Sequence, residues 1–211
     1  MNIDGSVSIQ LAQRGVAYAP QIVNAAQSHG LDPALLAAVA AQETGGPGTN
    51  AGRNVVGDGG HGHGLFQIDD RWHEFAKTGA AMDPGRNANY AAGMIAGLVK
   101  RYGGNIREAL SAYNAGDPHA AGTRTTWADG ATLSYADSVF RHYALLTGAS
   151  PQSEAVESAR SDAPDASERV NALLALSNEL SRLPAAHHHR FSTGHSTRQA
   201  TSYDAYLNGD D

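Results

Sequence analysis

The feature that most constrains this chain is an alanine- and leucine-rich segment, residues 33–44, that runs directly into a glycine-rich one, residues 45–64. Asp32 followed by Pro33 is a strong helix start, because the aspartate can cap free backbone N–H groups and proline fits the first helical turn. The apolar segment is therefore predicted to be a helix. The glycines exclude a helix after it and predict a loop or a short hairpin with unusual backbone angles.

Glu43 stands at the end of this predicted helix. It lies seven residues after Leu36 and four after Val39, so it shares their apolar face. Burial on that face disfavours the charged form of a carboxyl group, which makes Glu43 a candidate proton donor. The alternative is an exposed glutamate at a helix end, the common situation for this residue type.

Composition and charge narrow the function classes. The net charge is −6, and neither residues 1–150 nor residues 151–211 carry an excess of basic side chains, which argues against nucleic acid and anionic membrane surfaces as partners. No apolar run reaches the roughly 18 residues of a transmembrane helix. With no cysteine in the chain, a disulfide scaffold, a thiolate metal site and a cysteine nucleophile are excluded.

Helical periodicity dominates the first 150 residues, and it predicts a mainly α domain over residues 1–150. Further helices are expected near residues 17–29, 87–101, 106–113 and 135–146, and residues 65–68 are expected to form a buried turn or short strand. Beyond this domain we expect a polar linker at 151–164, an amphipathic helix at 167–183 that could dock on the core or on a partner, and a mobile polar tail.

Two carboxylates flank the glycines, Asp58 and Asp69, and Glu43 precedes them. Glycoside hydrolysis uses this kind of set, since one carboxylic acid protonates the leaving oxygen and a second carboxylate activates water. The sequence alone does not show that the three side chains converge.

Two other patterns in this region carry less weight. His61, His63 and His73, with Asp58 or Asp69, could bind a metal, but no recognised ligand motif accompanies them, so no metal is predicted. Gly57, Gly59 and Gly62 formally match a dinucleotide-binding motif, but no strand precedes them and no helix opens from them. The histidines at 187–189 are interpreted as a solvated run.

Four blocks, in order, resemble the goose-type lysozymes of the lysozyme-like superfamily, which also holds the soluble lytic transglycosylases. The blocks are residues 41–45, 57–69, 111–116 and 135–139. The resemblance implies an α+β lysozyme-like fold in which the glycine-rich loop or hairpin lines a glycan cleft. It also implies peptidoglycan glycan strands as the partner and no cofactor.

The resemblance also implies roles for individual residues. Glu43 corresponds to the general acid. Phe66 and Gln67 correspond to the turn that lines the cleft, with phenylalanine in place of the usual methionine. The remaining substrate contacts would come from His73, Tyr113, Asn114 and Tyr135.

Two chemistries fit this pattern. Goose-type lysozymes carry aspartates at positions matching Asp58 and Asp69 and use them to hold the water that hydrolyses, with inversion, the β-1,4 bond between N-acetylmuramic acid and N-acetylglucosamine. Lytic transglycosylases generally lack them and form 1,6-anhydromuramyl ends instead. The two aspartates lead us to favour hydrolysis, with the lytic transglycosylase as the alternative and a non-catalytic glycan-binding or virion structural protein as a third hypothesis.

The N-terminus shows no secretory signal pattern. Together with the lack of cysteine, this favours a bacterial or phage enzyme made in the cytoplasm. Such an enzyme would act on the cell wall after lysis, delivery in a virion or specialised secretion.

Overall fold

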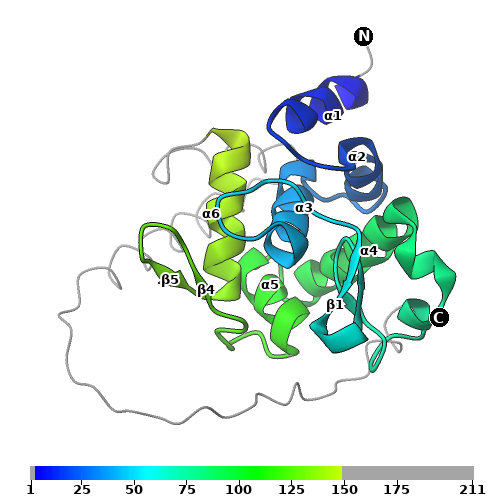
Figure 1. The fold of residues 1–211 in the computed structure, drawn as a ribbon, viewed down its shortest axis with the longest axis vertical. Helices are drawn as coiled ribbons and strands as arrows, with labels where there is room; N and C mark the ends of the chain where they lie inside the picture. Colours follow the sequence, from blue (N-terminus) through cyan, green and yellow to red (C-terminus); the bar gives the residue numbers. More distant parts are fainter. Residues whose placement is uncertain (1–2, 149–211) are drawn as a thin grey trace. The chain divides into compact units, whose positions relative to one another are not determined.

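A computed structural model describes residues 3–148 of the chain. The predicted linker, the helix at 167–183 and the polar tail lie outside these residues. The described part is mainly helical, as predicted, with two small antiparallel sheets (Figure 1). Its helices are α1 (Ile3–Gln13), α2 (Ala19–Ser28), α3 (Pro33–Ala40), α4 (Pro84–Arg101), α5 (Ile106–Ala115) and α6 (Tyr135–Thr147). Its strands are β1 (Val55–Gly57), β2 (Gly62–Gly64), β3 (Ile68–Asp69), β4 (Thr125–Thr126) and β5 (Thr132–Leu133).

Helix α3 forms the centre of the core. It packs against α2 and α6, while α4 packs against α2 and α5, and Figure 1 shows α3 enclosed by these elements. Its side chains from Leu36 to Ala40 are at most 1% exposed, so removal of apolar surface from water drives this arrangement. None of the helices in residues 3–148 combines the length and the hydropathy needed to cross a membrane.

Helix caps account for most of the boundaries. The Asp32 carboxylate accepts a hydrogen bond from the Ala34 N–H at 2.8 Å, as predicted for the start of α3. The same signal occurs at Asp83, whose carboxylate accepts from the Arg86 N–H at 2.8 Å. Helix α4 therefore begins at Pro84, three residues before the predicted start at 87.

The structure differs from the sequence prediction in three further places. Helix α1 was not predicted, because Gly5 and two serines weaken its helical pattern. Tyr18 does not belong to the helix that follows it; it adopts a left-handed φ of 56° and is 37% exposed. The hairpin of β4 and β5 was also missed, since strands of two residues are too short to show an alternating pattern.

Residues 55–64 of the glycine-rich segment form a hairpin, one of the two alternatives predicted for it. Strand β2 pairs antiparallel with both β1 and β3, so Gly62 lies between Gly57 on one side and Asp69 on the other. The buried Asn87 of α4 fixes the end of this sheet: it accepts the Phe66 N–H at 2.8 Å and donates to the His63 carbonyl at 3.0 Å. The hairpin and the turn after it are therefore held against the helical core.

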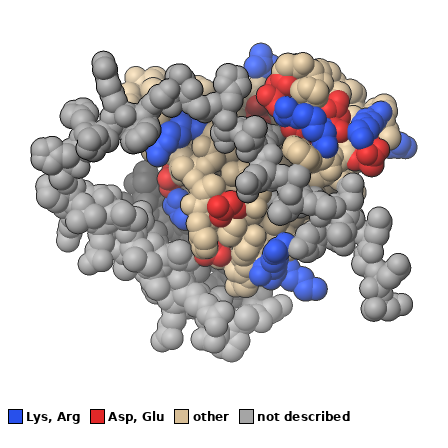
Figure 2. Space-filling model, turned by 90° about the horizontal axis from the view of Figure 1, so that it is seen from below, with Lys and Arg blue, Asp and Glu red and all other residues tan. Residues whose placement is uncertain are grey.

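Some of the charged side chains on the outside lie in pairs of opposite sign. At the upper right of Figure 2, blue basic groups stand beside red acidic ones. Three of the ion pairs are Glu74 with Lys77, Arg107 with Asp137, and Asp129 with Arg141.

Candidate active site

Glu43 lies in a π-helical turn, Ala41–Gly45, that widens the last turn of α3. Such turns are frequent at functional sites. The prediction of a core-facing carboxylate is met in part, because Glu43 is half-buried. The hydroxyl of Tyr135, at the start of α6, donates a hydrogen bond of 2.6 Å to Glu43 Oε1. This bond fixes the orientation of the carboxyl group.

The residue before Glu43 anchors the same turn. The Gln42 amide accepts from Ser138 Oγ at 2.5 Å and donates to Thr125 Oγ1 at 2.8 Å. Ser138 in turn accepts a bond of 3.0 Å from the indole N–H of Trp127. The hairpin of β4 and β5 and helix α6 therefore both hold the turn that presents Glu43.

Tyr113 links this acid to the turn at residues 66 and 67. Its hydroxyl donates to the Phe66 carbonyl at 3.0 Å, and its ring centroid lies 6.5 Å from that of Tyr135. The Phe66 side chain is 0% exposed. The prediction that this side chain lines the cleft is therefore corrected: it packs in the core, and the backbone of Phe66 is what connects to the site.

Gln67 follows with a left-handed φ of 49°. Its amide donates to the carbonyls of Val55 at 3.0 Å and Gly64 at 2.8 Å. A side chain at Gly57 or Gly62 would overlap the Gln67 amide oxygen. A side chain at either of these paired glycines would therefore displace the half-buried Gln67 amide from its present position.

Asn114 and His73 are largely buried and bind other parts of the protein. Asn114 is 9% exposed, and its side-chain oxygen accepts the Thr123 N–H at 2.7 Å, which orders the loop after α5. His73 is 6% exposed and lies 3.0 Å from the Tyr90 hydroxyl. In this conformation both residues shape the fold around the site.

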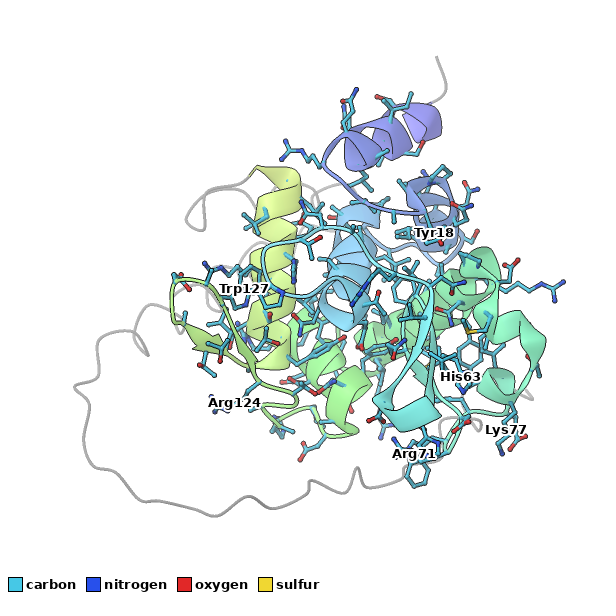
Figure 3. The ribbon with its side chains drawn as sticks, in the orientation of Figure 1. Tyr18, His63, Arg71, Lys77, Arg124 and Trp127 are labelled. Atoms are coloured by element: carbon cyan, nitrogen blue, oxygen red, sulfur yellow. The ribbon has the colours of Figure 1, made fainter. Side chains whose placement is uncertain are left out.

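Asp58 and Asp69 do converge, on the guanidinium group of Arg71. Arg71 Nη2 lies 2.5 Å from Asp58 Oδ2 and 2.5 Å from Asp69 Oδ2. Arg71 Nε and the Arg71 backbone N–H also donate to Asp69 Oδ1, at 2.9 and 2.8 Å. The bond to Asp69 raises the pKa of Arg71 above its ordinary value. Figure 3 shows Arg71 at the end of the β1–β2–β3 sheet.

The histidines of the glycine-rich segment have a partner other than a metal. His61 Nδ1 lies 2.8 Å from one oxygen of Asp70, and His63 Nε2 lies 3.2 Å from the other. These bonds, the one to His61 first, hold the pKa of Asp70 below its ordinary value. Because Asp58 and Asp69 bind Arg71, the sets of metal ligands considered from the sequence do not assemble here.

Replacing Tyr135 with Phe tests the coupling to Glu43. We expect the rate of the reaction that uses Glu43 to fall by about ten- to a hundredfold, since a hydrogen bond to this carboxyl group contributes about 1.5–3 kcal/mol once the group is ionised. Tyr143→Phe is the matched control, because Tyr143 lies on the same helix and donates to the Asp32 carboxylate at 2.7 Å, away from Glu43. The control should lose stability and keep its rate per folded molecule. Equal rates for both variants would show that the Tyr135 hydroxyl does not contribute to the reaction that uses Glu43.

Comparison with protein families identifies the domain that contains this site. Residues 20–127, just over half of the chain, match the model of the transglycosylase SLT domain. The match contains Glu43, Gln67 and Tyr113, whereas Tyr135 lies beyond it. The match confirms the resemblance to the soluble lytic transglycosylases and supports an enzyme that acts on glycans, with peptidoglycan as the substrate. The chain therefore belongs to the transglycosylase SLT domain family.

Proposed function

We propose that this protein is a lytic transglycosylase. It would cleave the β-1,4 bond between N-acetylmuramic acid and N-acetylglucosamine and leave a 1,6-anhydromuramyl end. This was the alternative from the sequence, and the match to the transglycosylase SLT domain supports it over hydrolysis.

In the proposed reaction Glu43 acts twice. As an acid, it donates its proton to the glycosidic oxygen while the bond from that oxygen to C1 of the muramic acid breaks. The C6 hydroxyl of the same sugar then forms a bond to C1, and the Glu43 carboxylate accepts the proton of that hydroxyl. No water is consumed, and Glu43 ends protonated as it began. Tyr135 is assigned to positioning, because its hydroxyl bonds to Glu43 Oε1.

The observation that carries the proposal is the shared contact of Asp58 and Asp69 with Arg71. An inverting hydrolase needs a second carboxylate that accepts a proton from water. A carboxylate oxygen that already accepts a charge-assisted bond from a guanidinium would have to leave that contact to accept a proton from water. Intramolecular attack by the C6 hydroxyl needs only Glu43.

Hydrolysis remains the second candidate, and one observation favours it. The Asp58 side chain is 53% exposed, so water has access to it. Hydrolysis would then require Asp58 to act as the base while Asp69 keeps Arg71 in place.

The experiment that separates the candidates is mass spectrometry of the fragments released from purified sacculi. We expect anhydromuramyl ends, which are lighter by one water than the reducing ends left by hydrolysis. A preponderance of reducing ends would replace the proposal with the hydrolase. Binding to sacculi without any released fragment, from a folded preparation, would favour a non-catalytic glycan-binding protein.

A further inference from the structure

Arg71 lies between the two aspartates that hydrolysis would need and transglycosylation would not. Gly57 and Asp69 both pair with Gly62, so the last residues of β1 and β3 lie at the same end of the sheet, on either side of β2. Adjacent strands are about 4.8 Å apart, and the long Arg71 side chain spans this separation. Its Nη2 atom contacts a carboxylate oxygen of each aspartate at 2.5 Å.

We propose that Arg71 determines the product of the reaction: by binding Asp58 and Asp69 together, it prevents either carboxylate from activating water, and the bond cleaved with the aid of Glu43 is closed by intramolecular transfer. This inference rests on the proposed function. It makes Arg71 a specificity-determining residue that acts through the two aspartates.

The two contacts differ in strength. Asp69 has a side chain that is 5% exposed, and both of its oxygens accept bonds from Arg71. Its carboxylate is thus a fixed part of the fold. Asp58 has a side chain that is 53% exposed and contacts Arg71 through Oδ2. Exposed ion pairs contribute about 0–1 kcal/mol, so Asp58 is the carboxylate that a small change at Arg71 would release.

Lysine provides the sharpest substitution at position 71. Arg71 binds Asp69 through both Nε and Nη2 and binds Asp58 through Nη2, and the single ammonium nitrogen of lysine cannot take both of these positions. In Arg71→Lys the charge can still neutralise the buried Asp69, so the protein should fold, while Asp58 loses its contact. The Asp58 carboxylate would then be half exposed, and both of its oxygens would be open to a water that attacks C1. The C1 to water-oxygen bond forms as the glycosidic bond breaks, and Glu43 supplies the proton to the leaving oxygen.

The test measures the ratio of reducing to anhydromuramyl ends released from purified sacculi in isotopically labelled water. Hydrolysis introduces one heavy oxygen at the new end, and transfer introduces none. We expect Arg71→Lys to raise this ratio at least about tenfold. This estimate is low, because a well-placed general base usually speeds a reaction by about a hundredfold or more. Asp58→Asn in the Arg71→Lys background should return the ratio to that of the wild type. Asp58→Asn alone should leave it unchanged, because Arg71 already occupies that carboxylate.

Each outcome decides a separate question. A wild-type protein that releases anhydromuramyl ends, with a ratio that does not respond to Arg71→Lys, keeps the proposed function and overturns the role of Arg71. Folded Arg71→Lys that cleaves nothing would also overturn it, since Arg71 would then be needed for cleavage itself. A wild-type protein that releases mainly labelled reducing ends overturns the proposed function directly. A response to Arg71→Lys that persists without Asp58 would show that the effect does not pass through that carboxylate.

Discussion

Replacing Glu43 with Gln should abolish nearly all release of fragments from peptidoglycan and leave the fold intact. Gln keeps the size of the side chain and an oxygen that can accept the bond from Tyr135, which is 2.6 Å long to Glu43 Oε1. It cannot donate a proton to the glycosidic oxygen as a carboxylic acid does. General acid and base catalysis contributes about 100- to 10,000-fold each, and the proposed reaction uses Glu43 for both. We therefore expect a loss of at least about a thousandfold.

The measurement is the initial rate of fragment release from sacculi, with thermal unfolding of each variant followed by circular dichroism. Glu74→Gln is the matched control, because the Glu74 side chain is 75% exposed and pairs with Lys77 on the surface. The control should retain its rate. A folded Glu43→Gln protein with ordinary activity would contradict both the proposed transfer and the hydrolysis that it competes with, since each requires this acid.

The parts of the fold that could be predicted are those in which a short segment carries its own signal. Asp32 followed by Pro33 predicts the start of α3, because the cap and the proline act within one turn of helix. Asp83 with Pro84 carries the same signal and was overlooked in favour of the apolar periodicity that becomes clear at residue 87. The glycine density predicts a hairpin, since few other residues adopt the positive φ found at Gly59 and Gly64.

The site could be predicted only as residue types. Glu43 was recognised from the end of an apolar helix, but its bond to Tyr135 joins residues 92 positions apart. Arg71 carries no sequence signal that distinguishes it from a surface arginine. Its importance arises from the pairing of β2 with β1 and β3, which brings Asp58 within reach. Phe66 was misassigned because an apolar residue in a turn can face a ligand or the core, and the sequence pattern does not separate these alternatives.

The sequence analysis also gave no role to His142. Its burial leads to a second prediction with a large expected effect, on the stability of the protein in acid. It lies on α6 with 0% exposure, and within the described residues neither of its ring nitrogens has a hydrogen-bond partner. Its ring centroid is 4.8 Å from that of Trp127, whose indole bonds to Ser138 beside the Glu43 turn. Burial, aided by the nearby charge of Arg141, lowers the pKa of His142 from 6.5 to about 4.

This shift makes the stability of the protein dependent on acid. Above pH 6.5 His142 is neutral in both the folded and the unfolded chain and has no effect. Between pH 6.5 and about 4 the unfolded chain binds a proton that the folded protein does not, so stability falls as the pH falls. With about 1.4 kcal/mol for each pKa unit, the loss should be about 3 kcal/mol. Below about pH 4 this residue adds no further loss.

His142→Leu should remove this dependence, because leucine is apolar and does not titrate. It should also raise stability near neutral pH by about 1–3 kcal/mol, since a buried polar group without a partner is replaced. The measurement is the free energy of unfolding in guanidinium chloride at pH 7 and at pH 4.5, and His119→Leu, at an exposed position, is the control. The control should keep the slope of the wild type. A loss of stability in His142→Leu as large as that of the wild type between these two pH values would contradict the prediction. The acid sensitivity would then arise from the paired carboxylates and not from His142.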